Sequence, residues 1–250
     1  MLNQLDQTHR DFYMGGEYSK YNEDWHDEDG PIKATEICAL LKKNQISFRT
    51  CADVGCGTGR VMAILASLYD ADFFGYEITD IPSERTVQQP ENVKLIIGDF
   101  FSTSELSSYD LIMLNDVVEH IPDFFSFLNK VKLYSRYLVI RIPIEINVLH
   151  TLTNRHIYNR RRVGHLHYFS KDTALATVEE CGLRVVDWQY AFDGLNMPHT
   201  SRSFLKLALK IPRLVSLRCF PDLGVRLFGG AGVLILAQNP LWSAEGRLST

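Results

Sequence analysis

Three glycines and an acid stand close together in the segment from Asp53 to Gly59, which reads DVGCGTG. The segment follows a short apolar run and precedes a helical pattern, so we expect a turn from a strand into a helix. Glycine permits positive backbone angles and leaves space for a ligand beside the backbone. The start of the following helix offers unpaired N–H groups and a partial positive charge. The pattern favours a bound cofactor, and a glycine turn without a ligand is the alternative.

Glu77 lies at the end of the next predicted strand, 22 residues after Gly55. A carboxylate at that place can accept two hydrogen bonds from a ribose 2′,3′-diol. A dinucleotide fingerprint needs glycine or alanine at position 60, which is Arg60 here. Asp53 suits the ammonium of a methionine-like group better than a pyrophosphate. Both kinds of cofactor stay open on these residues alone.

A second acid follows the third predicted strand, in the sequence Gly98-Asp99-Phe100. Its carboxylate can accept from an adenine amino group, and the phenylalanine ring can cover the base. A fourth strand then leads into the segment 109–123, YDLIMLNDVVEHIPD, which is rich in acids and amides.

Short apolar runs alternate with helical patterns along most of the chain, which predicts a Rossmann-like α/β fold with a mostly parallel sheet and helices on both faces. We expect strands over 48–56, 71–78, 92–99, 109–117, 137–144, 183–191 and 232–239, and helices over 31–46, 60–69, 123–135 and 170–182. Residues 31–250 are predicted to form one domain with insertions at 145–169 and 192–231. Residues 1–30 are predicted to form an N-terminal arm.

In this order the motifs resemble those of class I S-adenosylmethionine-dependent methyltransferases, in particular the type 11/23 group with its ubiquinone-biosynthesis O-methyltransferase-like proteins. The resemblance covers roughly residues 48–191 and the last strand. It rests on DVGCGTGR, GYEIT, GDFF, YDLIMLNDVVEHIPD and HLHYFS. It implies a seven-stranded sheet whose last strand is antiparallel, with the cofactor at the carboxyl edge of the strands.

The resemblance also implies roles for single residues around S-adenosylmethionine. The methionine part would lie against Asp53 and the turn, above Asn115 and Asp116, while Glu77 would hold the ribose. Asp99, Phe100 and Ile78 would contact the adenine. The implied cofactor-binding residues are Asp53, Gly55, Cys56, Gly57, Gly59, Glu77, Ile78, Asp99, Phe100, Asn115 and Asp116.

Histidines are the candidates for a general base, because methyl transfer to a hydroxyl needs one near the acceptor. His165 and His167 of the segment GHLHYFS fall on one side of an extended stretch within an insertion that would overhang the substrate. His120 is the third candidate. The alternative is that a histidine only orders the loop. Ser170 is expected to be the N-cap of the next helix.

Asp116, Glu119 and His120 form an acid-x-x-Glu-His run, which can bind a divalent cation in methyltransferases of the ubiquinone-biosynthesis type. We prefer the interpretation that this run packs at the strand-to-helix turn, and we expect no metal.

Aromatic residues beside two glycines in the N-terminal arm predict a lid over the site, with a solvated acidic arm as the alternative. The expected lid residues are Tyr18, Tyr21, Trp25 and His26. Arg155 and Tyr168 are expected on the substrate side, because an arginine cluster at 155–162 suits phosphate or carboxylate. A solvated charged surface is the alternative there.

Charge and cysteine content limit the class of protein. The net charge is −4, which disfavours a nucleic-acid binder. The five cysteines form no CxxC pair, which disfavours a disulfide framework or a zinc cluster and suits a reducing cytosol. We therefore expect a cytoplasmic protein. The basic, apolar segment 202–220 is interpreted as a helix that covers the sheet, with peripheral membrane contact as the alternative.

The expected function is methyl transfer from S-adenosylmethionine to a small molecule, most simply at an oxygen of an anionic or lipid- or sugar-linked metabolite. The main alternative is a methyltransferase-fold module without catalysis that associates with a membrane or partner through the segment 202–220. A nicotinamide enzyme is disfavoured by Arg60. The acceptor and the oligomeric state stay open.

Overall fold

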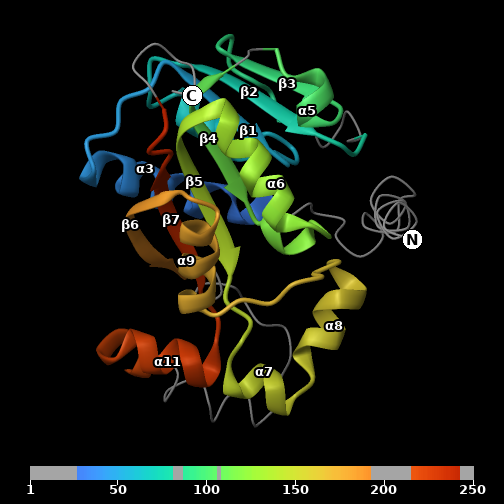
Figure 1. The fold of residues 1–250 in the computed structure, drawn as a ribbon, viewed down its shortest axis with the longest axis vertical. Coiled ribbons are helices and arrows are strands. Elements are labelled where there is room, and N and C mark those ends of the chain that lie inside the picture. Colours follow the sequence, from blue (N-terminus) through green and yellow to red (C-terminus); the bar gives the residue numbers. More distant parts are fainter. Residues whose placement is uncertain (1–26, 81–86, 106–107, 193–214, 243–250) are drawn as a thin grey trace.

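A seven-stranded sheet forms the centre of the protein (Figure 1). The computed structural model describes residues 27–80, 87–105, 108–192 and 215–242. The strands are ordered β3-β2-β1-β4-β5-β7-β6, and β7 is antiparallel to both of its neighbours. Their bounds are β1 Thr50–Val54, β2 Asp72–Glu77, β3 Val93–Ile97, β4 Tyr109–Asn115, β5 Ser135–Pro143, β6 Arg184–Ala191 and β7 Gly232–Gln238. The predicted fold class is confirmed, including the antiparallel last strand.

Two apolar cores lie on opposite faces of this sheet, because successive side chains of a strand point to opposite sides. In β4, Leu111 and Met113 enter one core, whereas Ile112 and Leu114 enter the other. The first core is covered by α3 Gly30–Lys43 and α4 Arg60–Ala66, and the second by α6 Phe124–Val131 and α9 Lys171–Glu180. All four helices were predicted, with ends that differ by a few residues.

The chain makes a long excursion between β5 and α9. A β-bridge between Ile144 and Phe169 joins the two ends of this excursion. The N–H groups of Glu145 and Ile146 donate to the Phe169 carbonyl there. The sequence predicted an insertion here but no helices, and the structure contains two: α7 Val148–Leu152 and α8 Arg155–Arg162. Neither helix packs a buried side chain against the sheet, so their sequences lack the apolar stripe that the core-covering helices show.

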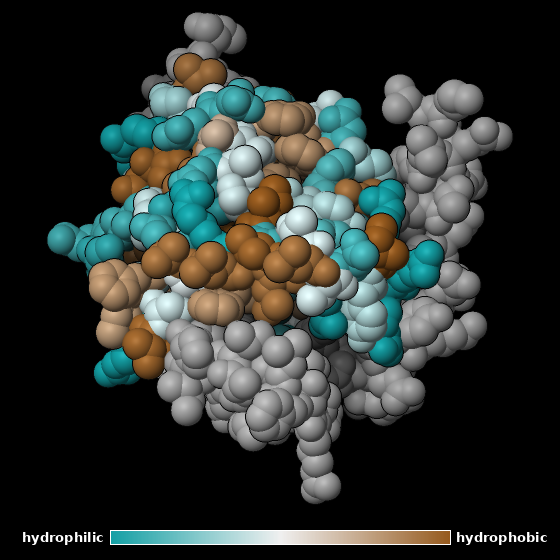
Figure 2. Space-filling view, turned by 90° about the horizontal axis from the view of Figure 1, so that it is seen from below, coloured by the Kyte–Doolittle hydropathy of each residue, from teal (hydrophilic) through white to brown (hydrophobic). Residues whose placement is uncertain are grey.

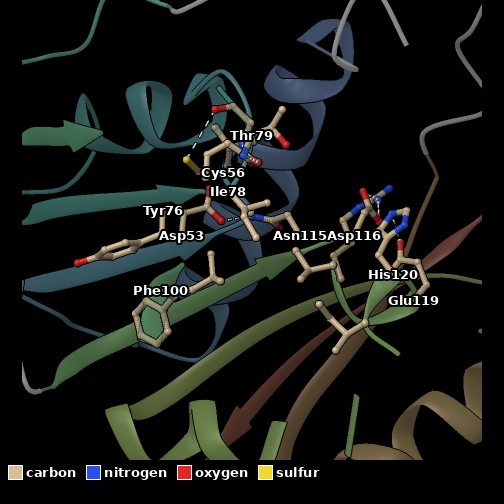
Figure 3. A pocket seen from close by; sticks show the side chains of 18 of the residues that line it. Asp53, Cys56, Tyr76, Ile78, Thr79, Phe100, Asn115, Asp116, Glu119 and His120 are labelled. Carbon is tan, nitrogen blue, oxygen red and sulfur yellow. Dashed lines mark hydrogen bonds and ion pairs between the residues drawn. The ribbon is translucent and has the colours of Figure 1, made fainter. Parts of the chain in front are cut away.

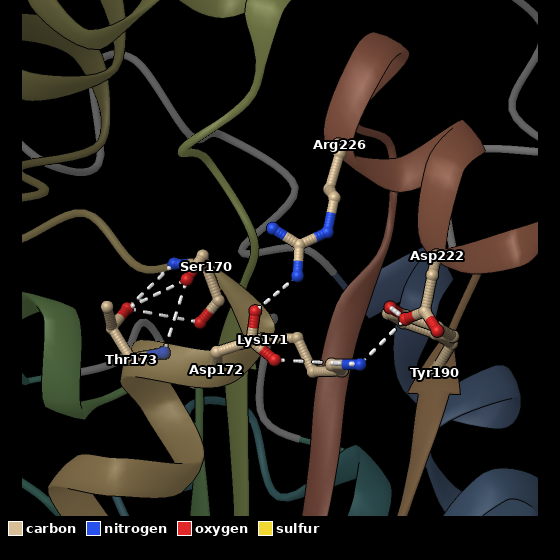
Figure 4. Close-up of polar contacts among 7 residues, drawn as sticks. All are labelled: Ser170, Lys171, Asp172, Thr173, Tyr190, Asp222 and Arg226. Atoms are coloured by element: carbon tan, nitrogen blue, oxygen red, sulfur yellow. Dashed lines mark hydrogen bonds and ion pairs between the residues drawn. The ribbon is translucent and has the colours of Figure 1, made fainter.

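Helix α11, Pro221–Phe228, packs against α7 at the lower end of the molecule in Figure 1. Polar contacts connect it to α9 and β6 (Figure 4). Lys171 Nζ lies 2.7 Å from Asp222 Oδ1, which also accepts from the Tyr190 hydroxyl, and Arg226 pairs with Asp172. The remaining short helices are η1 Asp27–Asp29, α5 Phe100–Thr103, η2 Val118–His120 and η3 Lys132–Tyr134.

The start of α9 confirms Ser170 as its N-cap. The Ser170 hydroxyl accepts from the Thr173 N–H and the Thr173 hydroxyl accepts from the Ser170 N–H, which is a capping box. Residues 215–219 are helical, but most of the predicted 202–220 helix lies outside the described residues. So do the predicted lid residues Tyr18, Tyr21, Trp25 and His26. Within the described ranges, no helix has the length and apolar character needed to cross a bilayer.

Gly75 in β2 is required by close packing against α4. A Cβ atom at this position would lie 2.1 Å from Met62 Cε and 2.8 Å from Cys56 Sγ. We expect Gly75→Val to lower the free energy of unfolding by about 1–3 kcal/mol, the usual cost of overpacking a core. Urea denaturation measures it. In the double variant with Met62→Ala, the losses of unfolding free energy should partly cancel, because the alanine vacates the space that the valine enters. A loss equal to the sum of the two single-variant losses would contradict this packing.

Candidate active site

A cavity of about 760 Å³ opens at the carboxyl ends of β1, β2 and β4 (Figure 3). Its volume is within the range of small-molecule sites. The order of the strands reverses between β1 and β4, which is where α/β sheets bind ligands. The lining combines the glycine turn, the ends of β2 and β4, η2 and part of the insertion.

The glycine turn forms one wall of the cavity. Gly55, with φ +75°, has no room for a side chain, since a Cβ atom would lie 2.8 Å from Val117 Cγ2. Gly59, with φ +80°, is the N-cap of α4. A Cβ atom at Gly57 would meet no protein atom within 4 Å. Gly57 therefore borders open space, which fits a ligand lying against the turn.

Glu77 supports this turn from the end of β2. Its Oε2 accepts from the Gly57 N–H at 3.0 Å and its Oε1 accepts from the Thr79 N–H at 2.9 Å. The side chain is buried, and burial raises the pKa of the carboxyl although these N–H donors oppose the shift. Glu77 thus connects two segments of the cavity wall.

Asp53 is a buried acid that forms no ion pair with any of the described residues. It is 1% exposed, and its Oδ1 accepts from Asn115 Nδ2 at 3.1 Å (Figure 3). Burial raises the pKa of Asp53 to about 7, because the Asn115 bond and the more distant Lys33 compensate only in part. Asn115 Oδ1 is also buried, and no group in the described part of the chain forms a hydrogen bond with it. A cationic ligand group beside Asp53 would therefore stabilise its charged form.

Asp116 is balanced by two cations. Arg141 Nη1 donates to both of its carboxylate oxygens at 2.5 Å, and Lys33 Nζ lies 2.9 Å from Oδ2. Burial alone would raise the pKa of Asp116, but the two cations outweigh burial and lower it. Sequence reasoning missed both partners. Arg141 gave a signal, as the one charge in the apolar run YLVIRIPI, whereas Lys33 gave none.

The predicted adenine contacts line another part of the cavity. Asp99 caps α5 by accepting from the Phe101 N–H at 2.9 Å. Phe100 is only 4% exposed, because its ring packs in the core against Tyr76 and Tyr134. Cys56 and Ile78 also reach the cavity. All eleven predicted cofactor residues lie at this wall or, for Gly59, directly beside it.

The opposite wall holds Glu119, His120 and His165. Glu119 is fully buried, and its Oε1 lies 3.9 Å from His120 Nε2. Neither of its carboxylate oxygens has a hydrogen-bond partner among the described residues, and burial together with nearby Asp116 raises its pKa. The rings of His120 and His165 are 4.8 Å apart. Ligand atoms of these three residues lie within 4.8 Å of one another, so the group could hold a metal ion. The metal-binding run considered in the sequence contained Asp116 instead of His165. The carboxylate of Asp116 is already paired with Arg141 and Lys33.

His165 is held by an acid that the sequence analysis did not identify. Its Nδ1 lies 3.1 Å from Oε1 of Glu145, which is buried and also accepts from Asn159 Nδ2. Burial lowers the pKa of His165, but the contacts with Glu145 and Glu119 outweigh it, so the pKa is raised. The signal available in the sequence was an acid directly after the buried strand and before an acid-free stretch.

Three residues predicted on the substrate side do not line the cavity. His167 packs on Phe124, and its Nε2 lies 3.2 Å from the Pro122 carbonyl oxygen. Arg155 stacks over Tyr158, and the Tyr168 hydroxyl donates to the His156 carbonyl at 3.0 Å. Arg155 begins α8, whereas His167 and Tyr168 lie in the non-helical stretch that follows this helix.

The Glu145 contact predicts how His165 titrates. We expect Glu145→Gln to lower the pKa of His165, since the variant removes the negative charge that stabilises the imidazolium. NMR titration of the histidine signals measures this without an acceptor. His165→Gln assigns the signal, and His167→Gln is the control that leaves it in place. An unchanged pKa in Glu145→Gln would contradict the pairing.

Comparison with known proteins agrees with this geometry. A family model for a methyltransferase domain matches residues 26–187. A search of curated proteins gives no significant match. Solved structures with a similar fold include magnesium protoporphyrin IX methyltransferase from Synechocystis PCC 6803 with bound SAH (12% identity, TM-score 0.58, covering 92% of this chain and 97% of the other).

Two further structures show the same fold. A SAM-dependent methyltransferase from Archaeoglobus fulgidus has 21% identity and a TM-score of 0.50, with 82% of this chain and 94% of the other covered. The plantazolicin methyltransferase BpumL, in complex with a monoazolic desmethylPZN analog and SAH, has 16% identity and a TM-score of 0.53, with 88% of each chain covered. The family model, the sheet order and the cavity together show that the chain belongs to the S-adenosylmethionine-dependent methyltransferases of class I fold.

Proposed function

We propose that this methyltransferase acts on a small molecule, at an oxygen, with His165 as the general base. The observation that carries the proposal is the arrangement of the cavity. One wall carries the glycine turn and the uncompensated Asp53, and the other carries His165 held by Glu145.

The cofactor residues are proposed to act as the resemblance implies. Asp53 and Asn115 would bind the methionine end. Asp53 forms no ion pair with the described residues, and Asn115 Oδ1 is buried with no hydrogen-bond partner among them. Glu77 would bind the ribose while it supports the turn, and Asp99 with Ile78 would contact the base. S-adenosylmethionine supplies a methyl group already activated by its positive sulfur. The protein therefore has mainly to align the acceptor and remove its proton.

His165 is suited to removing that proton. Its Nδ1 faces Glu145, so Nε2 is the nitrogen left to accept a proton from a hydroxyl in the cavity. Glu145 would fix the ring orientation and stabilise the imidazolium that forms. Since the pKa of His165 is raised, the neutral base becomes more abundant as the pH rises, and the rate should rise with it. His120, against the ring of His165, would line the acceptor site.

The acceptor is proposed to be an anionic or a lipid- or sugar-linked metabolite. Cationic side chains at the cavity support this. Lys33 and Arg141 pair with Asp116, and Glu36 also lies near both. Lys130 and Arg60 also line the opening. A cytoplasmic location stays a prediction from the thiol content.

Cofactor binding can be tested before the acceptor is known. We expect calorimetry to show micromolar binding of S-adenosylmethionine and of its demethylated product. Gly57→Arg should abolish binding, because its side chain would enter the open space beside the turn. Leu68→Arg, which adds the same side chain at an exposed site after α4, should bind normally. Unchanged binding by Gly57→Arg would refute the proposed site.

The raised pKa of Asp53 predicts that binding depends on pH. Below pH 7 the free protein holds a proton on Asp53, and an ammonium beside the carboxyl would expel it. Affinity should therefore rise with pH, by up to about tenfold per unit, and level off near pH 7. Calorimetry in buffers of different ionisation enthalpy measures the released proton. Asp53→Asn should remove this release and Glu77→Gln should retain it; the reverse result would move the ammonium to Glu77.

A further inference from the structure

An exposed apolar surface lies at the end of the molecule that carries α7 and α11. Seen from below, brown side chains form a continuous band there (Figure 2). Large exposed apolar residues come from both helices and from the segment that precedes α11. They are Val148, Leu152, Val215, Phe220, Leu223 and Leu227, and we call this set the apolar face.

The spacing of these residues shows that the face is a regular feature of both helices. Val148 and Leu152 are four residues apart on α7, and Phe220, Leu223 and Leu227 follow a three-and-four spacing along α11. The opposite side of α11 already packs inward through Gly224 and Val225. The outward apolar residues are therefore not needed for the core. Leu152 is 78% exposed, so covering it with an apolar partner surface would be favourable in free energy.

The charge around the face is strongly positive. Residues 146–171 and 215–231 contain one acid, Asp222, and its carboxylate is bonded by Lys171 and Tyr190 (Figure 4). The same stretches contain the arginines Arg155, Arg160, Arg161, Arg162 and Arg218, whereas Lys171 and Arg226 are paired with Asp222 and Asp172. Arg218 stands between Val215 and Phe220 and is exposed. Apolar residues interspersed with arginine and lacking free acids match an interface with anionic lipid headgroups.

We propose that the apolar face binds the surface of an anionic lipid bilayer. The leucines and Phe220 would enter the boundary between headgroups and acyl chains, while Arg218 and the α8 arginines would contact lipid phosphates. This inference goes beyond methyl transfer and does not depend on it. The face belongs partly to the same insertion that supplies Asn159 and His165 to the cavity, so docking would hold the acceptor side of the cavity near the lipid.

Vesicle flotation with the full chain tests the proposal. We expect the protein to float with vesicles of phosphatidylcholine and phosphatidylglycerol, to remain unbound with phosphatidylcholine alone, and to dissociate as salt is added. Leu152→Ser and Leu223→Ser should each weaken binding roughly tenfold, through loss of apolar burial. Arg218→Glu should weaken it by about tenfold or more and reduce its salt dependence.

Matched controls separate this surface from general effects. Leu68→Ser alters a leucine as exposed as Leu223, at 53% against 52%, and should bind vesicles like the wild type. Calorimetric cofactor binding by every variant shows that the methyltransferase half is intact, so failure of the proposed function would be seen separately. Equal flotation of wild type and both leucine variants would overturn the proposal. So would a wild-type dimer in sedimentation that Leu152→Ser converts to monomer, because a second copy would then cover the face.

Discussion

Buried carboxylates at one edge of the sheet are the constraint on which the site depends. Asp53 and Glu77 end β1 and β2, and Glu119 follows β4, all with exposures of 7% or less. Removing a carboxylate from water is unfavourable unless a partner or a proton compensates it. Parallel strands end at the same edge, so the fold concentrates this unfavourable energy in one place. The contacts around each acid show whether a partner compensates its burial. Where none does, a ligand group could supply the compensation.

The acids around the cavity are accommodated in different ways. Asp116 is neutralised by Arg141 and Lys33 and stays charged, so it belongs to the scaffold even though it lines the cavity. Glu77 is bound by backbone N–H groups and supports the glycine turn. Asp53 and Glu119 have raised pKa values and incomplete partners. The cavity thus has one uncompensated acid on the cofactor wall and one on the acceptor wall, which are the two places where a ligand would contribute most.

The cofactor half could be predicted from the sequence because its signals are local. The turn from Asp53 to Gly59, the acid at the end of β2 and the cap at Asp99 each lie within a few residues of the strand end that positions them. The acceptor half could not, because its contacts join distant segments. Lys33 reaches Asp116 across 83 residues, and the Glu145 contact with His165 depends on the path of α7 and α8. Those helices lack an apolar stripe facing a core, so neither hydrophobic periodicity nor the resemblance indicated them.

The bridge between Ile144 and Phe169 separates a segment that can vary in sequence and length from the sheet and helices that must keep their structure. The excursion leaves β5 and returns to α9 at one hydrogen-bonded point, and Leu166 and His167 near its end also donate to the Glu119 carbonyl. These backbone contacts hold β5 and α9 in place independently of α7 and α8. Closing a longer loop adds only about 0.6 kcal/mol for each doubling of its length. Insertions, deletions and exchanged helices are therefore inexpensive within residues 145–168 and disruptive in the glycine turn. The acceptor side of the cavity can therefore change at little cost in stability, while the cofactor side tolerates few changes.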